Sequence, residues 1–130
     1  FAAVAPVSGL TLEWMYRDCD TPAPIPLFEI HGTEDRTSAW EGDLENKGGW
    51  GAYLPVEIAV GYWVAANRCV REQTDTLALR RHPVVAHRFV GGTGGNEVWL
   101  YEVVDGGHSW AEKDMDTSEE IWRFFGRFVK

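Results

Sequence analysis

Two residues of this chain, Asp35 and His108, have the types and the placement that acid–base chemistry needs. Asp35 follows the apolar run 26–30 and a turn that contains Gly32, and His108 follows the apolar run 98–104 and a turn with two glycines. Turns at the carboxyl ends of parallel strands bring such side chains into one crevice. A histidine there can take a proton from a nucleophile, while a carboxylate fixes its tautomer. We therefore predict that the Asp35 carboxylate faces the His108 ring within or close to hydrogen-bond reach.

The order of these residues is the closing half of the Ser…Asp…His order of α/β-hydrolases. The opening half, a serine in the pattern G-x-S-x-G, is absent from the chain. Ser8 has Pro6 in place of the first glycine, although Gly9 follows it. The other serines lie in a polar loop, directly after the histidine and at the start of a helix (Ser38, Ser109 and Ser118). The sequence thus predicts two triad members without the nucleophile.

Other ionisable residues compete for these roles. Glu34 is a rival of Asp35 as the acid, and Asp105 is a weaker one. His31 ends its strand directly before Gly32, and we interpret it as a support of the turn. The remaining histidines, His82 and His87, are expected to be exposed or half-buried, and no zinc-binding spacing of Cys and His is present. We predict no metal and no other cofactor.

The elements that must position this pair follow from the pattern of apolar residues. Residues 1–8 predict a buried strand, and residues 25–31 predict a second. Pro55 is expected to begin a helix that runs to about residue 66. Residues 84–90 and 97–104 flank a glycine-rich turn and predict a hairpin. The stretches 10–24, 36–53 and 70–83 are predicted to be loops or connections.

A last helix is predicted after residue 117. Thr117 and Glu120 have the spacing of a capping box. The residues that follow form one apolar stripe at helical spacing (Ile121, Trp122, Phe125, Phe128 and Val129). Strands alternating with helices predict an α/β fold with a mostly parallel sheet, to which the hairpin adds an antiparallel edge.

Composition limits the function classes. A single domain fits 130 residues, and the net charge of −8 argues against nucleic acid as a partner, because phosphate binding needs clustered Lys and Arg. No apolar stretch approaches the ~20 residues of a membrane span. Cys19 and Cys69 could form one disulfide or remain free, and the sequence leaves both alternatives open.

The tryptophans are expected to divide between core and loops. Trp40, Trp50 and Trp110 lie in loops near the predicted crevice, and Trp40 and Trp110 are our candidates for contact with substrate. The three others that follow apolar patterns are expected in the core (Trp63, Trp99 and Trp122).

Taken together, several motifs resemble the polyhydroxybutyrate depolymerase and feruloyl esterase family of extracellular α/β-hydrolases. The similarity is distributed over most of the chain, in the opening run 1–9, Ile30–Asp35, Trp63 with Asn67-Arg68-Cys69, Gly106–Trp110 and Ser118–Phe125. In two places the chain departs from the family. It has no cysteine near the hairpin to pair with Cys69, and Ala111-Glu112 follows Trp110 where the family has Pro-Gly.

The resemblance implies that Asp35 is the triad acid and His108 the triad base, and that the nucleophile lies upstream. We therefore expect residues 1–130 to be the C-terminal portion of an α/β-hydrolase domain without its nucleophile half. The expected parent activity is carboxylic-ester hydrolysis in an extracellular or periplasmic protein. Alone, the chain is expected to be inactive and to self-associate or require the missing half. The alternative is a non-catalytic binding module that uses the aromatic loops of the same scaffold.

Overall fold

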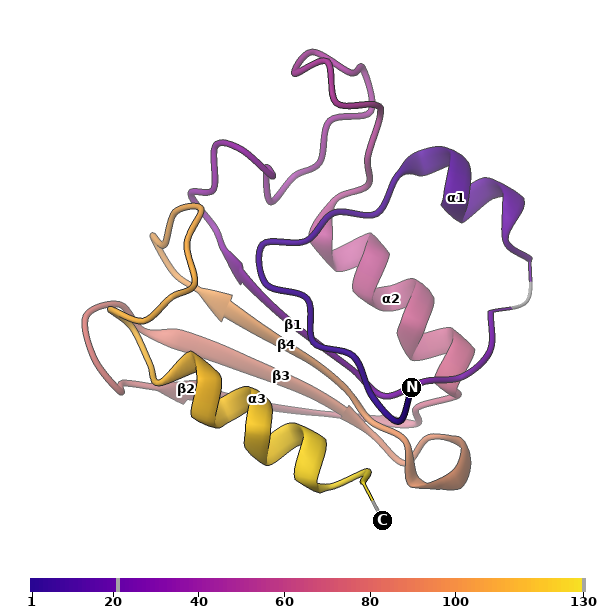
Figure 1. The fold of residues 1–130 in the computed structure, drawn as a ribbon, viewed down its shortest axis with the longest axis vertical. Coiled ribbons are helices and arrows are strands. Elements are labelled where there is room, and N and C mark those ends of the chain that lie inside the picture. The colour runs from indigo at the N-terminus through magenta and orange to yellow at the C-terminus, as the bar shows by residue number, and fades with distance from the viewer. Residues whose placement is uncertain (21, 130) are drawn as a thin grey trace.

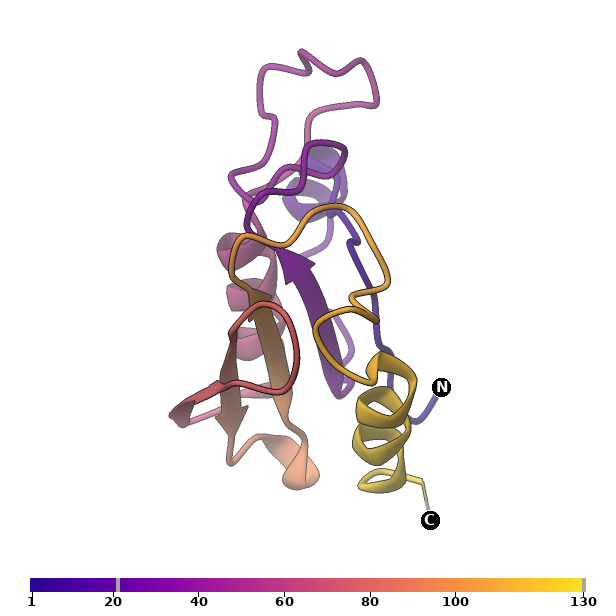
Figure 2. The same cartoon turned by 90° about the vertical axis from the view of Figure 1, so that its left-hand side faces the viewer.

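The computed structural model describes residues 1–20 and 22–129, and its centre is a four-stranded sheet in the order β1-β4-β3-β2. Helices α2 and α3 cover opposite faces of this sheet (Figures 1 and 2). The elements, in chain order, are α1 (Glu13–Asp18), β1 (Leu27–Gly32), α2 (Val56–Asn67), β2 (Arg71–Leu77), β3 (Val84–Val90), the 3₁₀ turn η1 (Thr93–Gly95), β4 (Val98–Val103) and α3 (Thr117–Gly126). A mixed sheet between helices is an arrangement of the α/β type.

The sheet is mostly antiparallel, so the prediction of a mostly parallel sheet was wrong. Only β1 and β4 run parallel among the named strands, in a register from Leu27 opposite Val98 to Gly32 opposite Val103. The pairs β4–β3 and β3–β2 are antiparallel. The predicted hairpin is confirmed as β3 and β4, and β2 extends it into a meander. Antiparallel neighbours need only short connections, whereas a parallel pair needs a long crossover.

The N-terminal segment lies beside β1 and is only half-buried, unlike the buried strand that we predicted. Val4 and Val7 pair in parallel with Leu27 and Ile30, as isolated bridges rather than a regular strand. Pro6 explains the interruption, because it has no N–H with which to continue the ladder. Its carbonyl still accepts a hydrogen bond from the Ile30 amide at 3.1 Å.

β1 is the most buried strand because both of its faces are covered. Phe28 and Ile30 pack in the core that includes α3, whereas Leu27 packs with α2 on the other face. The α3-side core combines residues of three strands with the segment before α3 and α3 itself (Phe28, Ile30, Val84, Ala86, Tyr101, Val103, Ala111, Met115 and Phe124). The smaller core under α2 contains Leu27, Val56, Val60, Val98 and Leu100.

Two elements occur where loops were predicted. The short helix α1 occupies part of 10–24 and has no buried residue. β2 occupies part of 70–83, and its side chains are exposed except for the half-buried Leu77. Charged side chains on an edge strand discourage pairing with other chains. The loop 36–53 is confirmed as lacking helix and regular strand, and α2 begins directly after Pro55 as predicted.

The last helix differs from its prediction in its cap and its buried face. Asp116 is the N-cap, and its side chain accepts a hydrogen bond from the Glu119 amide, so the capping box on Thr117 was wrong by one position. Phe124 is fully buried, whereas Trp122 is 73% exposed and is not a core residue. Ile121, Phe125 and Phe128 of the predicted stripe are half-buried against the same core, so the buried face of α3 is centred on Phe124.

Both cysteines are free thiols, Cys19 exposed and Cys69 half-buried. A disulfide is therefore not the link between α1 and α2. Among the described residues, no helix combines the length and the apolar character needed to cross a membrane.

Candidate active site

The turns after β1 and β4 lie against one another at the same end of the sheet. Backbone hydrogen bonds connect them, from the Thr33 amide to the Val103 carbonyl at 3.0 Å and from the Glu34 amide to the Gly106 carbonyl at 2.9 Å. Gly32 permits this approach, because a Cβ there would lie 2.5 Å from the carbonyl carbon of Gly106. The parallel register of β1 and β4 thus brings both turns to one place.

Asp35 is held by the backbone of its own turn. Its Oδ1 atom accepts hydrogen bonds from the Thr37 amide at 2.9 Å and from the Ser38 amide at 2.8 Å. An aspartate that accepts from the amides that follow it forms an Asx-type turn. The Asp35 side chain has no solvent exposure. With Oδ1 held by these two amides, the orientation of the second oxygen, Oδ2, is fixed.

That second oxygen meets His108, so the predicted proximity of Asp35 and His108 is confirmed. The His108 Nδ1 atom lies 2.9 Å from Asp35 Oδ2. A carboxylate only accepts hydrogen bonds, so Nδ1 carries the proton and the neutral ring has a free lone pair on Nε2. The His108 side chain is 45% exposed. The catalytic roles of the two residues stay predictions.

Neither rival acid takes this position. Glu34 is exposed, and its backbone amide donates a hydrogen bond to the Gly106 carbonyl. Asp105 has a left-handed φ of 60° and its amide bonds the Thr33 hydroxyl, so it shapes the turn. Over residues 1–20 and 22–129, Asp35 is the one carboxylate hydrogen-bonded to His108.

A surface hollow of about 290 Å³ surrounds His108. Its other lining residues are Val7, Ser8, Ser109 and Trp110, so one of the two predicted substrate contacts lies in it. Trp40 does not line this hollow. It lies edge-on to the buried His31 ring, with the ring centroids 6.0 Å apart.

No nucleophile is assembled at His108 in the part of the chain that the structure describes. Ser8 lines the hollow and has a left-handed φ of 51°, but its hydroxyl donates to the Ser109 carbonyl at 3.3 Å. An activated serine instead donates to the base. The described residues also contain no group of three or more ligands that could hold a metal ion.

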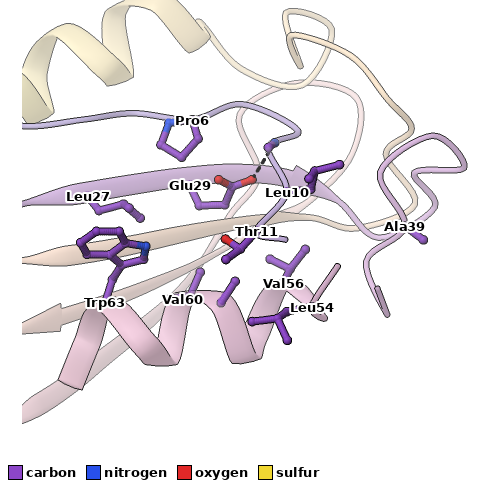
Figure 3. A pocket seen from close by; sticks show the side chains of 12 residues that line it. Pro6, Leu10, Thr11, Leu27, Glu29, Ala39, Leu54, Val56, Val60 and Trp63 are labelled. Carbon is purple, nitrogen blue, oxygen red and sulfur yellow. Dashed lines mark hydrogen bonds between the residues drawn. The ribbon is translucent and has the colours of Figure 1, made fainter. Parts of the chain in front are cut away.

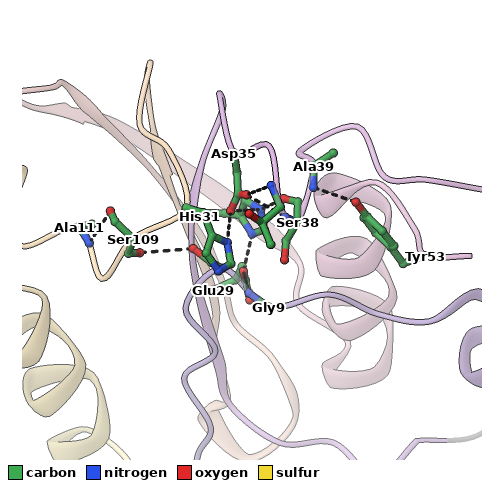
Figure 4. Close-up of polar contacts among 12 residues, drawn as sticks. Gly9, Glu29, His31, Asp35, Ser38, Ala39, Tyr53, Ser109 and Ala111 are labelled. Atoms are coloured by element: carbon green, nitrogen blue, oxygen red, sulfur yellow. Dashed lines mark hydrogen bonds and ion pairs between the residues drawn. The ribbon is translucent and has the colours of Figure 1, made fainter. Parts of the chain in front are cut away.

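Two further ionisable residues lie behind the pair, and the sequence reasoning missed one of them. Glu29 and His31 are buried on β1, with a 2.8 Å contact between Glu29 Oε1 and His31 Nδ1 (Figure 4). The His31 Nε2 atom lies 2.6 Å from the Ser38 carbonyl oxygen and 3.5 Å from Asp35 Oδ2. His31 was predicted to support the turn, and this contact with Ser38 confirms it. A glutamate between the apolar residues Phe28 and Ile30 was the available signal for Glu29.

The burial of these groups alters their proton affinities. Burial raises the pKa of Glu29, although the His31 contact offsets part of the effect. Burial acts to lower the pKa of His31, but the contacts with Glu29 and Ser38 outweigh it, so the His31 pKa is raised. A raised histidine pKa favours the imidazolium at neutral pH.

Glu29 also borders an apolar cavity of about 100 Å³ between the N-terminal segment, β1 and α2. Figure 3 shows the Glu29 carboxyl group on the β1 side, with Val60 and Trp63 of α2 opposite. The Gly9 amide donates to Glu29 Oε1 at 3.2 Å and so joins the N-terminal segment to this group.

Comparison with known proteins gives this chain no assignment. No protein-family model matches the sequence, and no curated protein matches it.

Proposed function

We propose that this chain carries the acid and the base of a serine-hydrolase triad, as the C-terminal part of a carboxylic-ester hydrolase. The parent enzyme would be similar to polyhydroxybutyrate depolymerases and feruloyl esterases, with a partial α/β-hydrolase fold in residues 1–130. The observation that carries the proposal is the 2.9 Å contact between buried Asp35 and half-exposed His108. Two turns of adjacent parallel strands present this pair.

In this mechanism His108 works through Nε2. That atom takes the proton from a serine hydroxyl as the hydroxyl attacks the ester carbonyl, and then returns it to the departing alcohol. A water molecule then attacks the ester formed on the serine. His108 takes a proton from this water and returns it to the serine as the acid leaves. Asp35 keeps the proton on Nδ1 and stabilises the imidazolium that forms. The serine and the oxyanion donors come from a segment outside these 130 residues or from a second polypeptide.

The hollow beside His108 is the proposed substrate side of the site. Trp110 supplies an aromatic wall there, whereas Trp40 supports the site through His31. The parent protein is proposed to be extracellular or periplasmic and to act on an ester without nucleic acid or membrane as a partner.

Ester hydrolysis by the chain and by the longer gene product tests the proposal. On p-nitrophenyl butyrate, we expect the 130-residue chain to be no faster than its His108→Ala variant. We expect the gene product extended upstream to contain G-x-S-x-G within ~30 residues of Phe1. Its kcat should fall about 10⁴-fold or more with His108→Ala or Asp35→Ala.

Glu34→Ala is the matched control, because this exposed carboxylate is next to Asp35 and does not contact His108. It should leave kcat unchanged. An upstream sequence without a nucleophile, or turnover that survives His108→Ala, would refute the hydrolase proposal.

A binding module is the second candidate, favoured by exposed aromatic residues. Trp50 is 73% exposed and Trp110 is 50% exposed, and such rings can stack on apolar or sugar ligands. This candidate predicts ligand binding that Trp110→Ala weakens and His108→Ala does not, together with an extended gene product that has no esterase activity.

A further inference from the structure

Glu29 and His31 take no part in the proposed chemistry, yet they are among the most buried polar residues of the chain. Only 7% of Glu29 and 1% of His31 is exposed. Burying ionisable groups is costly unless they are paired and hydrogen-bonded. The hydrogen bonds of Glu29 and His31 must therefore compensate for the cost of burying them.

Those contacts form one continuous chain that ends at His108. It runs from the Gly9 amide to Glu29, from Glu29 to His31, and from His31 to the Ser38 carbonyl. The Ser38 amide then donates to Asp35 Oδ1, and Asp35 Oδ2 accepts from His108. Figure 4 shows Glu29, His31, Asp35 and Ser38 clustered at this end of β1.

The hydrogen-bond partners determine where the protons lie. The Ser38 carbonyl only accepts, so His31 Nε2 carries a proton. A second proton lies between His31 Nδ1 and Glu29 Oε1, which are 2.8 Å apart. When it resides on Nδ1, an imidazolium is placed between two buried carboxylates, 2.8 Å from Glu29 and 3.5 Å from Asp35.

We propose that Glu29 and His31 are positioning residues for the Asp35–His108 pair, fixing the Asp35 turn through Ser38 and placing a positive charge beside the Asp35 carboxylate. The inference rests on the proposed function of that pair. Glu29 acts through His31, and His31 acts through Ser38 and Asp35. Neither residue contacts the hollow in which His108 lies.

The charge balance gives His31 a second effect. Without its positive charge, the Glu29 and Asp35 carboxylates would share a buried site as like charges, which is unfavourable. The charge of Asp35 already contributes to raising the pKa of Glu29. His31 therefore allows Asp35 to stay a hydrogen-bond acceptor for His108.

The groups that face His31 are few. Glu29 acts on it from β1 and Asp35 from the following turn, while the Trp40 ring covers one edge. His108, from the turn after β4, lies on the other side of Asp35. Substitutions of Glu29 and Asp35 therefore test the charges that act on this ring.

NMR of the histidine side chains tests the inference on the chain itself, without an activity assay. The chain has four histidines, which single substitutions can assign. At about pH 7 we expect His31 to show protons on both ring nitrogens. Glu29→Gln and Asp35→Asn should each lower the His31 titration midpoint, Glu29→Gln by about one pH unit or more. Asp114→Asn is the control, since Asp114 pairs with His82 and should leave His31 unchanged.

The His108 Nδ1 proton gives the readout that a merely structural role would not move. Glu29→Gln preserves the shape of residue 29 but lets His31 become neutral, so Asp35 becomes a stronger acceptor. The His108 Nδ1 proton should then shift downfield while the His82 and His87 signals stay in place. His31→Phe removes the Ser38 contact and should speed exchange of that proton with solvent.

An unchanged His108 Nδ1 proton in Glu29→Gln, or a neutral His31 in the wild-type chain at about pH 7, would overturn the inference. If His31→Phe does not fold, the wild-type and Glu29→Gln spectra still decide. The ester assay tests the triad separately. If the hydrolase proposal fails, His108→Ala and Asp35→Ala will not reduce ester turnover, whereas these spectra report only on the positioning of Asp35 and His108.

Discussion

Gly32→Ala perturbs a position at which the two turns of the candidate site approach too closely for a side chain. The new Cβ would lie 2.5 Å from the Gly106 carbonyl carbon and 2.6 Å from the Gly107 carbonyl oxygen. Real Cβ atoms essentially never approach a neighbour closer than 3.0 Å. These neighbours are all backbone atoms, and the Gly106 carbonyl oxygen is the nearest of them. No flexible side chain can give way, so the turns must part by nearly an ångström.

We expect this change to lower the free energy of unfolding by about 2 kcal/mol, within the usual range for overpacking. The same displacement weakens the backbone hydrogen bonds of Thr33 and Glu34. It also stretches the 2.9 Å contact between His108 and Asp35 beyond the length of a good hydrogen bond. The His108 Nδ1 proton should then exchange faster with solvent.

Urea unfolding followed by tryptophan fluorescence measures the effect, with Gly61→Ala as the matched control. Gly61 lies within α2, and a Cβ there has no neighbour within 4 Å. Alanine is the better helix former, so this control should raise the free energy of unfolding by about 0.5–1 kcal/mol. The same Gly→Ala substitution should therefore lower the free energy of unfolding at position 32 and raise it at position 61. A Gly32→Ala chain as stable as the wild type would refute the account of how the turns meet.

Three more predictions concern the rest of the fold. Asp116→Ala removes the N-cap of α3 and should cost about 1 kcal/mol of unfolding free energy in urea, so an unchanged midpoint would contradict this assignment. Burial acts to lower the pKa of His87, but its hydrogen bonds to Glu102 and Glu72 have the larger effect. The pKa of His87 is therefore raised above 6.5. The resulting stabilisation is present below pH 6.5 and is lost as the pH rises through the raised pKa. Unfolding free energies at about pH 6 and about pH 8 should therefore differ less in Glu102→Gln than in the wild type. Burial raises the pKa of Cys69, so Cys69 should react with a thiol reagent more slowly than exposed Cys19, as measured on the two single Cys→Ser variants.

Features that depend on neighbouring residues could be predicted from the sequence. The glycine-containing turns after two apolar runs located Asp35 and His108, and their predicted proximity is confirmed. Pro55 located the start of α2, and the glycine-rich turn located the β3–β4 hairpin. Turn chemistry and apolar periodicity are local properties, so a single sequence expresses them.

Features that depend on distant residues could not be predicted, because they arise from packing in the folded chain. β2 is polar and has no apolar alternation, and it is a strand because its backbone completes the open edge of β3. Phe124 rather than Trp122 is buried, because the packing of α3 on the sheet fixes which face turns inward. Glu29 reads as an isolated charge in an apolar strand. Its role became visible only in the folded structure. Both faces of β1 are covered, so the Glu29 carboxyl group is buried and needs a hydrogen-bond partner, which is His31.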